Sequence, residues 1–220
     1  MSDSRSDPVR LSPHAAPAAI EAESFRIIES EVPEPRPFAG AEWRVVRRMI
    51  HTGADFELLD LVRFSPGAVA AGVAALSRGC RIVTDTEMAR AGMVARRMEP
   101  LSCRVECLMH DPRAAERARR DGGTRARAAV DLCLESGGAD VWAIGNAPTA
   151  LIRLLERLDA GAPRPALVVG LPVGFVNAAE SKALLLARPD LEFITVRGRK
   201  GGSTLVAAVV NALAEEALAI

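Results

Sequence analysis

From residue 61 onward, short apolar runs alternate with longer segments in which apolar residues recur every three or four positions. The short runs predict buried strands, and the longer segments predict helices with one apolar face. The predicted strands are Leu61–Phe64, Arg81–Thr84, Arg104–Met109, Asp140–Ile144, Ala166–Gly170 and Glu192–Val196. Strands that are apolar throughout and separated by helices are typical of parallel sheets buried on both faces. The pattern therefore predicts an α/β fold, a three-layer sandwich with a mainly parallel sheet covered by helices on both faces.

Capping side chains and prolines mark where the predicted helices start. The signals are Ser65-Pro66, for a helix that runs to Gly79, and then Asp85, Asp111-Pro112, Thr124, the region of Pro148, Asn177 and Ser203. Two more helices are predicted before the first strand, over Ala18–Glu31 after Pro17 and over Ala41–Thr52 with closure at Gly53. We expect residues 1–16, which are rich in polar residues and proline, to form a disordered tail, and residues 17–220 to form a single domain.

The chain carries 28 basic and 28 acidic residues, so no overall field draws it toward nucleic acid or an anionic membrane. No apolar run approaches the ~20 residues of a membrane span, and the first residues are polar, so we expect a cytoplasmic protein. The four cysteines include no Cys-x-x-Cys pair, and their spacing indicates neither a disulfide scaffold nor a redox motif. Cys103, Cys107 and His110 could hold a metal ion, but burial along one strand explains them better, and we expect no protein-bound metal.

Ligands of such folds gather beyond the carboxyl ends of the strands. The loop over Arg197–Ser203 places three glycines and three cations ahead of a helix N-terminus, an arrangement that favours an anion. This loop is not a Walker loop, and the first strand-to-helix turn has no GxGxxG, which weakens the case for a nucleotide. The alternative is a structural turn with solvated cations. Asn146, in the loop after another strand, is either a hydrogen-bonding group for a ligand or a turn residue.

His51 ends the second predicted helix, with Arg48 one turn earlier and Asp55 four residues later. An imidazole, a guanidinium and a carboxylate can therefore meet in space, and histidine is the side chain best matched to proton transfer near neutral pH. The alternative is that His51 only interacts with the dipole of its own helix.

Three other side chains have both a functional and a structural interpretation. Arg125 begins a helix, where it either points to a ligand or is solvated. Lys182 lies in the first turns of another helix, in Glu180-Ser181-Lys182, and is either a ligand group or part of a surface charge cluster. Met88 either lines an apolar pocket for a ring or fills the core.

Four segments each carry a weak motif, and together they are specific. They are Arg48-Met49-Ile50-His51-Thr52, Gly145 to Leu151, Pro172 to Val176 with Glu180-Ser181-Lys182, and Arg197 to Ser203. In this order and at these separations, the chain resembles the precorrin-8X methylmutase (precorrin isomerase) family from about Ile20 to Leu213.

The resemblance implies an isomerase of cobalamin biosynthesis. Such an enzyme moves a methyl group from C-11 to C-12 of precorrin-8X or cobalt-precorrin-8 by a 1,5-sigmatropic shift, giving hydrogenobyrinate or cobyrinate. The resemblance also implies that no cofactor is needed, that any cobalt is carried by the substrate, and that the protein is a homodimer. By motif, His51 corresponds to the catalytic histidine, which gives a proton or hydrogen bond to the ring C nitrogen.

The same resemblance suggests which groups hold the substrate, whose many carboxylates make arginines useful. Ser24 corresponds to a helix serine near the pocket, and the four cations Arg48, Arg125, Lys182 and Arg199 correspond to groups that hold the substrate periphery. With Met88 and Asn146, which were discussed above, the expected substrate-binding set is Ser24, Arg48, Met88, Arg125, Asn146, Lys182 and Arg199.

The chain departs from the family at three pocket hydroxyls. Glu21 stands where the family has tyrosine, Ala126 replaces the serine of Thr-Arg-Ser, and Met93-Val94 replace the last two residues of Gly-Ile-Thr. The segments Ala54 to Glu57 and Thr84 to Thr86 are more similar to the cobalt-handling branch of the family than to the metal-free one.

Two other functions fit parts of the sequence. A non-catalytic tetrapyrrole-binding protein would keep the arginines but would not need His51. An α/β enzyme acting on a phosphorylated metabolite would use the loop from Gly198 to Ser203 as a phosphate site.

Overall fold

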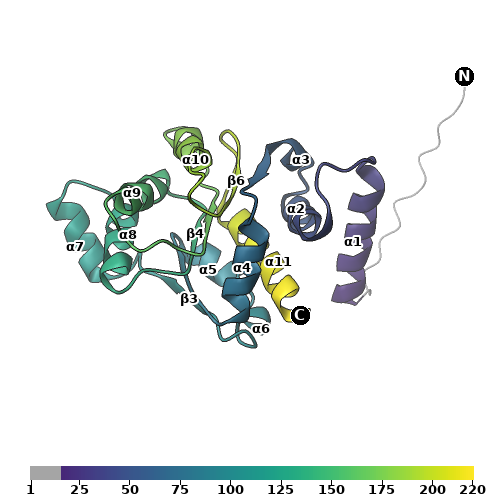
Figure 1. The fold of residues 1–220 in the computed structure, drawn as a ribbon, viewed down its shortest axis with the longest axis horizontal. Helices are drawn as coiled ribbons and strands as arrows, with labels where there is room; N and C mark the ends of the chain where they lie inside the picture. Colours follow the sequence, from purple (N-terminus) through teal and green to yellow (C-terminus); the bar gives the residue numbers. More distant parts are fainter. Residues whose placement is uncertain (1–15) are drawn as a thin grey trace, which may run out of the picture.

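A six-stranded sheet organises the computed structural model, which describes residues 16–220 (Figure 1). The strands are β1 Val62–Phe64, β2 Arg81–Thr84, β3 Arg104–Cys107, β4 Val141–Ile144, β5 Leu167–Gly170 and β6 Phe193–Val196. Their order across the sheet is β1-β6-β5-β4-β2-β3. Only the pairing of β1 with β6 is antiparallel, and the other four pairings are parallel. The prediction of a mainly parallel sheet is confirmed.

Helices cover both faces of this sheet, as predicted. On one face lie α1 Pro17–Glu31, α2 Gly40–Gly53, α3 Leu58–Leu61, α4 Ala68–Ser77, α5 Glu87–Gly92, α6 Ala95–Met98 and α11 Ser203–Leu218. The other side carries α7 Pro112–Arg120, α8 Arg125–Glu135, α9 Pro148–Asp159 and α10 Ala178–Leu186. Figure 1 shows these two groups on either side of the strands. The fold is the predicted three-layer sandwich.

Successive side chains of the central strands pack alternately into the hydrophobic cores on the two faces of the sheet. Val141 and Ala143 of β4 point to the face with α2 and α11, and Trp142 and Ile144 point to the face with α8 and α9. All four side chains are buried because successive side chains of a strand point to opposite faces, and both faces are covered. Helix α11 is buried nearly all round, since α2, α4, α5 and the sheet surround it.

The structure differs from the predicted elements mainly at their ends. The strand predicted over Arg104–Met109 stops at Cys107, because the next residues turn toward the Asp111 cap of α7. The helix predicted from Asp85 is capped by Thr86, whose side chain accepts from the Ala89 N–H. The helix predicted from Ser65-Pro66 to Gly79 is the shorter α4.

Two single-turn helices, α3 and α6, were not predicted, because four residues are too few to establish a helical period. The predicted tail lies outside the described residues, apart from Ala16. Within residues 16–220, no helix is both long and apolar enough to cross a membrane.

Candidate active site

His51 lies in the last turn of α2, and the residue after the helix, Ala54, adopts the left-handed conformation (φ 48°). Its ring packs edge-to-face on Phe25 of α1, with the ring centroids 5.2 Å apart. Helices α1 and α2 and the turn after α2 enclose a hollow of about 320 Å³. It is lined by Ser24, Ile27, Ile28, Glu31, Ile50, His51, Ala54 and Phe56. The imidazole therefore borders a largely apolar space that opens to solvent.

Ser24 is the one predicted binding residue that shares this hollow with His51. Its hydroxyl donates to the Ile20 carbonyl at 2.9 Å, one turn earlier on α1. That bond leaves the oxygen lone pairs available to a ligand, because a hydroxyl has one donor and two acceptor sites. The structure thus brings together Ser24 and His51, which are 27 positions apart in the chain, as predicted from the resemblance.

Arg48, one turn before His51, is buried and held in an ion-pair network. Its guanidinium donates to Glu21 at 3.0 Å and to both oxygens of Glu215 at 2.7 and 2.8 Å, and Arg97 also pairs with Glu215. Burial opposes the charge of Glu21, but the hydrogen bond and charge of Arg48 outweigh it and hold the pKa of Glu21 below its usual value.

This network bears on the predicted role of Arg48. With three hydrogen bonds to carboxylates of the chain, the guanidinium fixes α2 against α1 and α11, beneath the turn that carries His51. A direct contact between Arg48 and the substrate stays a prediction. Glu21 supplies one of the partner carboxylates.

The carboxylate of Asp85, which is not among the predicted site residues, organises the loop after β4. Asp85 is buried at the carboxyl end of β2 and accepts from the backbone N–H groups of Gly145, Asn146 and Ala147 at 2.9, 2.8 and 2.6 Å. Burial raises the pKa of Asp85, and these three donors lower it in part. The available signal was an acidic residue directly after a buried strand, next to another strand-end loop.

With its backbone held in this way, Asn146 turns its side chain to solvent at the carboxyl end of the sheet. Arg125, the first residue of α8, is exposed. It lies at the same end of the sheet, because the Thr124 hydroxyl hydrogen-bonds that of Thr149 at the start of α9 (2.8 Å). Arg125 borders a separate open hollow of about 610 Å³ together with Arg119. The structure therefore presents Arg125 and Asn146 to a ligand but does not place them in the hollow of His51.

The loops after β5 and β6 pack directly on each other. Gly201 is required there, since a side-chain carbon at that position would lie 2.1 Å from the Leu171 carbonyl oxygen. The Gly202 N–H donates to the same carbonyl at 2.9 Å. Arg199 remains exposed, with its guanidinium 5.4 Å from the ring centroid of Phe175, which is 84% exposed. Arg199 is therefore accessible to an anion, and a large apolar ring stands beside it.

Met88 is 65% exposed on α5, close after the carboxyl end of β2. Met88 therefore does not fill the core, which was the alternative to a role in lining an apolar pocket. An exposed thioether at this end of the sheet is available to an apolar ligand.

Two lysines connect the loop after β6 to its surroundings. The ammonium group of Lys200 pairs with Asp55 at 2.6 Å and with Glu57 at 2.8 Å, in the turn that follows His51. Lys182 is completely buried, and its ammonium group donates to the Lys200 carbonyl. The predicted contact of Lys182 with the substrate is thus not offered in this structure. The side chain instead holds the loop that carries Arg199.

The burial of Lys182 has a measurable effect on stability. Burial lowers the pKa of Lys182 to about 8 from its usual value near 10.5. Between these values the unfolded chain holds a proton that the folded chain has released, so the free energy of unfolding rises with pH. The contribution to the slope is at most about 1.4 kcal/mol per pH unit. We expect Lys182→Met to lose this contribution in urea denaturation at about pH 8, 9 and 10.

Lys200→Met is the matched control, because it removes the only other lysine of the chain and keeps the buried one. This variant should retain the wild-type slope between pH 8 and 9, because Asp55 and Glu57 raise the pKa of Lys200 above its usual value and keep its titration outside this range. Equal slopes in the wild type and Lys182→Met would show that the buried amine keeps its ordinary pKa.

Cys103, Cys107 and His110 were weighed above as possible metal ligands, and strand burial was the preferred explanation. Cys103 and Cys107 lie just before β3 and at its end, and no group of three or more His, Cys, Asp or Glu side chains suited to a metal ion occurs among residues 16–220.

Comparison with known proteins decides the family. The model of the precorrin-8X methylmutase family matches residues 19–216, which is most of the chain. The chain belongs to the precorrin-8X methylmutase family. A precorrin-8X methylmutase of Pseudomonas aeruginosa is 45% identical over 90% of this chain and 95% of its own length. A cobalt-precorrin-8 methylmutase of Priestia megaterium is 41% identical over 90% of this chain and 87% of its own length.

A solved structure of a precorrin-8X methylmutase from Thermus thermophilus has the same fold. It superimposes with a TM-score of 0.84 at 46% identity, and the match covers 91% of this chain and 96% of that one. The precorrin-8X methylmutase family is thus supported by sequence and by structure over nearly the whole described chain.

Proposed function

We propose that this protein is an isomerase of cobalamin biosynthesis that moves the methyl group at C-11 of precorrin-8X, or of its cobalt form, to C-12. The observation that carries the proposal is the position of His51, at the border of a largely apolar hollow that also contains the Ser24 hydroxyl. A corrin precursor has an apolar ring edge and polar ring nitrogens. The apolar wall of the hollow can pack against the ring edge, and the His51 imidazole can form a hydrogen bond with a ring nitrogen.

His51 is the group that supports the chemical step. A methyl shift within one molecule conserves atoms and electrons, so the protein has to bind and orient the ring and polarise it. We place the imidazole as the donor of a proton or hydrogen bond to the ring C nitrogen, which draws electrons from the carbon that receives the methyl group. The Arg48 network holds the helix that carries this donor.

The remaining exposed groups at the carboxyl end of the sheet suit the periphery of the substrate. Arg125 and Arg199 present guanidinium groups that can form paired hydrogen bonds with acetate and propionate carboxylates. Met88 and Phe175 offer apolar contacts, and Asn146 offers an amide. No redox or group-transfer cofactor enters this scheme, and cobalt, where present, arrives with the substrate.

The two segments that favoured a cobalt-containing substrate have structural roles that both branches could share. Asp55 pairs with Lys200, and Asp85 holds the loop after β4. Relatives named for either substrate match this chain at similar identity.

The decisive experiment is anaerobic incubation with precorrin-8X and with cobalt-precorrin-8, followed by absorbance spectroscopy. Turnover of neither substrate, with binding of either, would instead favour a tetrapyrrole carrier. We further propose that the enzyme is a cytoplasmic homodimer, which equilibrium sedimentation and cell fractionation would test.

Carboxylate binding by the loop arginines is tested by titration. Arg125→Leu and Arg199→Leu should each raise the dissociation constant of the tetrapyrrole about 10-fold or more, since a charge-assisted hydrogen bond contributes roughly 1.5–3 kcal/mol. Arg104→Leu, at the opposite end of the sheet, is the control and should bind like the wild type. If all three variants bind equally well, the carboxylates are held elsewhere.

A further inference from the structure

Two cysteines lie side by side at the edge of the sheet opposite the candidate active site. Cys80 comes immediately before β2 and Cys103 immediately before β3, and these strands pair in parallel with Arg81 opposite Arg104. The Arg104 N–H donates to the Cys80 carbonyl at 2.9 Å, so the pairing continues to this position. The two sulfur atoms are 3.7 Å apart.

The backbone before each cysteine fixes this approach. Gly79 (φ 74°) and Ser102 (φ 54°) both adopt the left-handed conformation, and they turn the chain into the two neighbouring strands. A side chain at Gly79 would lie 3.3 Å from the carbonyls of Leu101 and Ser102. The two turns are therefore packed against each other, and the cysteines have little freedom to separate.

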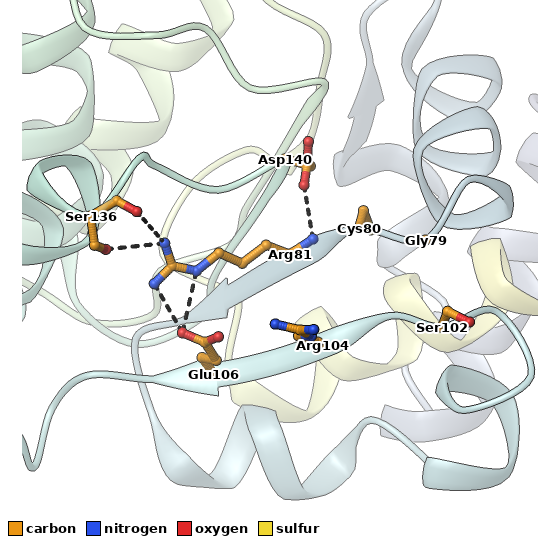
Figure 2. A pocket seen from close by; sticks show the side chains of 8 residues that line it. All are labelled: Gly79, Cys80, Arg81, Ser102, Arg104, Glu106, Ser136 and Asp140. Carbon is orange, nitrogen blue, oxygen red and sulfur yellow. Dashed lines mark hydrogen bonds and ion pairs between the residues drawn. The ribbon is translucent and has the colours of Figure 1, made fainter.

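An open hollow of about 470 Å³ lies at this end of β2 and β3, and Cys80 is part of its wall (Figure 2). The Cys80 side chain is itself buried, with 7% of the residue exposed, whereas Cys103 is partly exposed. Arg81 and Arg104 also line the hollow, together with Glu106 and Asp140, and Arg81 pairs with Glu106 at 2.9 Å. The hollow gives an oxidant access to the amino ends of the two strands, next to the partly exposed Cys103.

We propose that Cys80 and Cys103 form a reactive dithiol that is oxidised to an intramolecular disulfide by low-molecular-weight disulfides. Neighbouring parallel strands lie about 4.8 Å apart, which is within the separation that a disulfide spans. Bonded sulfurs are about 2.05 Å apart, and rotation of a cysteine side chain can close the remaining gap.

The partly exposed Cys103 is the attacking group. Its thiolate attacks one sulfur of the oxidant, and the other sulfur leaves as a thiolate. Cys80 then loses its proton and attacks the Cys103 sulfur of the mixed disulfide, and the second thiolate leaves. The oxidant gains two electrons and two protons and becomes two thiols, while the protein gains one S–S bond. The hydrogen bond between the two thiols lowers the pKa of Cys103, which favours this order of attack.

The disulfide would close a ring that contains β2, α5 and α6, including Asp85 and Met88. It would restrict the unfolded chain without placing a new group at the carboxyl end of the sheet. The proposal concerns this dithiol alone, and it holds whether or not the proposed methyl shift is correct.

The test is oxidation of the folded, full-length protein with oxidised glutathione, followed by intact mass and tryptic mapping under non-reducing conditions. The expected product has lost two hydrogen atoms, and the peptide Gly79–Arg81 is linked to the peptide Met98–Arg104. In Cys80→Ser, Cys103 should instead retain one glutathione, because the second attacking thiol is missing. Cys107→Ser is the control and should form the same disulfide as the wild type, since Cys107 lies at the far end of β3.

Two results would overturn the proposal. One is a wild-type map in which glutathione modifies Cys107 while Cys80 and Cys103 stay unlinked. The other is an equal level of glutathione on Cys103 in the wild type and in Cys80→Ser, which would show that the neighbouring thiol does not complete the reaction.

Discussion

Replacing His51 by alanine lowers turnover about 10²–10⁴-fold and leaves substrate affinity nearly unchanged. The reason is that the imidazole lies at one border of its hollow, where it can serve the reacting ring atoms, whereas the apolar walls supply most of the binding surface. Single-turnover kinetics under anaerobic conditions measure the chemical step, and an absorbance titration of the same sample measures the dissociation constant.

His110→Ala is the control, because that histidine is exposed after β3, beyond the helices that form the hollow. It should keep wild-type turnover. Wild-type single-turnover rates in His51→Ala would remove this residue from the chemistry and would favour a protein that binds tetrapyrroles without converting them.

Replacing Asp85 by alanine lowers the free energy of unfolding by roughly 2–3 kcal/mol. Three backbone N–H groups lose their acceptor, the buried one of Gly145 and the partly buried ones of Asn146 and Ala147, and a buried donor without a partner costs roughly 1–3 kcal/mol. Urea denaturation followed by circular dichroism measures the change. Asp85→Asn should fall between alanine and the wild type, because an amide has one acceptor oxygen and its NH₂ group faces donors.

Asp111→Ala supplies the comparison for a carboxylate that only caps a helix. Asp111 accepts from the Arg113 N–H at the exposed start of α7, and its loss should cost about 1 kcal/mol. If Asp85→Ala costs no more than Asp111→Ala, the loop after β4 does not depend on the buried carboxylate.

The layers of the fold could be predicted from the sequence because burial on both sheet faces leaves strands such as Val141–Ile144 apolar at every position. Helix starts were predictable where the signal is local. Asp111 caps α7, and Thr124 caps α8 through a hydrogen bond to an N–H within three residues. Asp85 shows the opposite case, because its partners lie 60 to 62 positions away and no local pattern reveals them.

The candidate site was predictable where a motif fixes the side chain, and less so where long-range packing decides its partners. His51 and Ser24 share a hollow because α1 packs on α2. The environment of Arg48 depends on Glu215, which is 167 positions away on α11. The burial of Lys182 similarly depends on the Lys200 loop folding over it. A cation in a motif identifies a position, but the charges around it decide whether it is free to bind.

The antiparallel placement of β1 has a consequence for biosynthesis on the ribosome. In the part of the chain that the structure describes, β1 pairs only with β6, and α2 packs most extensively on α11. Both partners come much later in the chain than α2 and β1. The helix that carries His51 therefore emerges early with only its neighbours α1 and α3 to pack on, and its main packing surface forms only once residues 193–218 have also been translated.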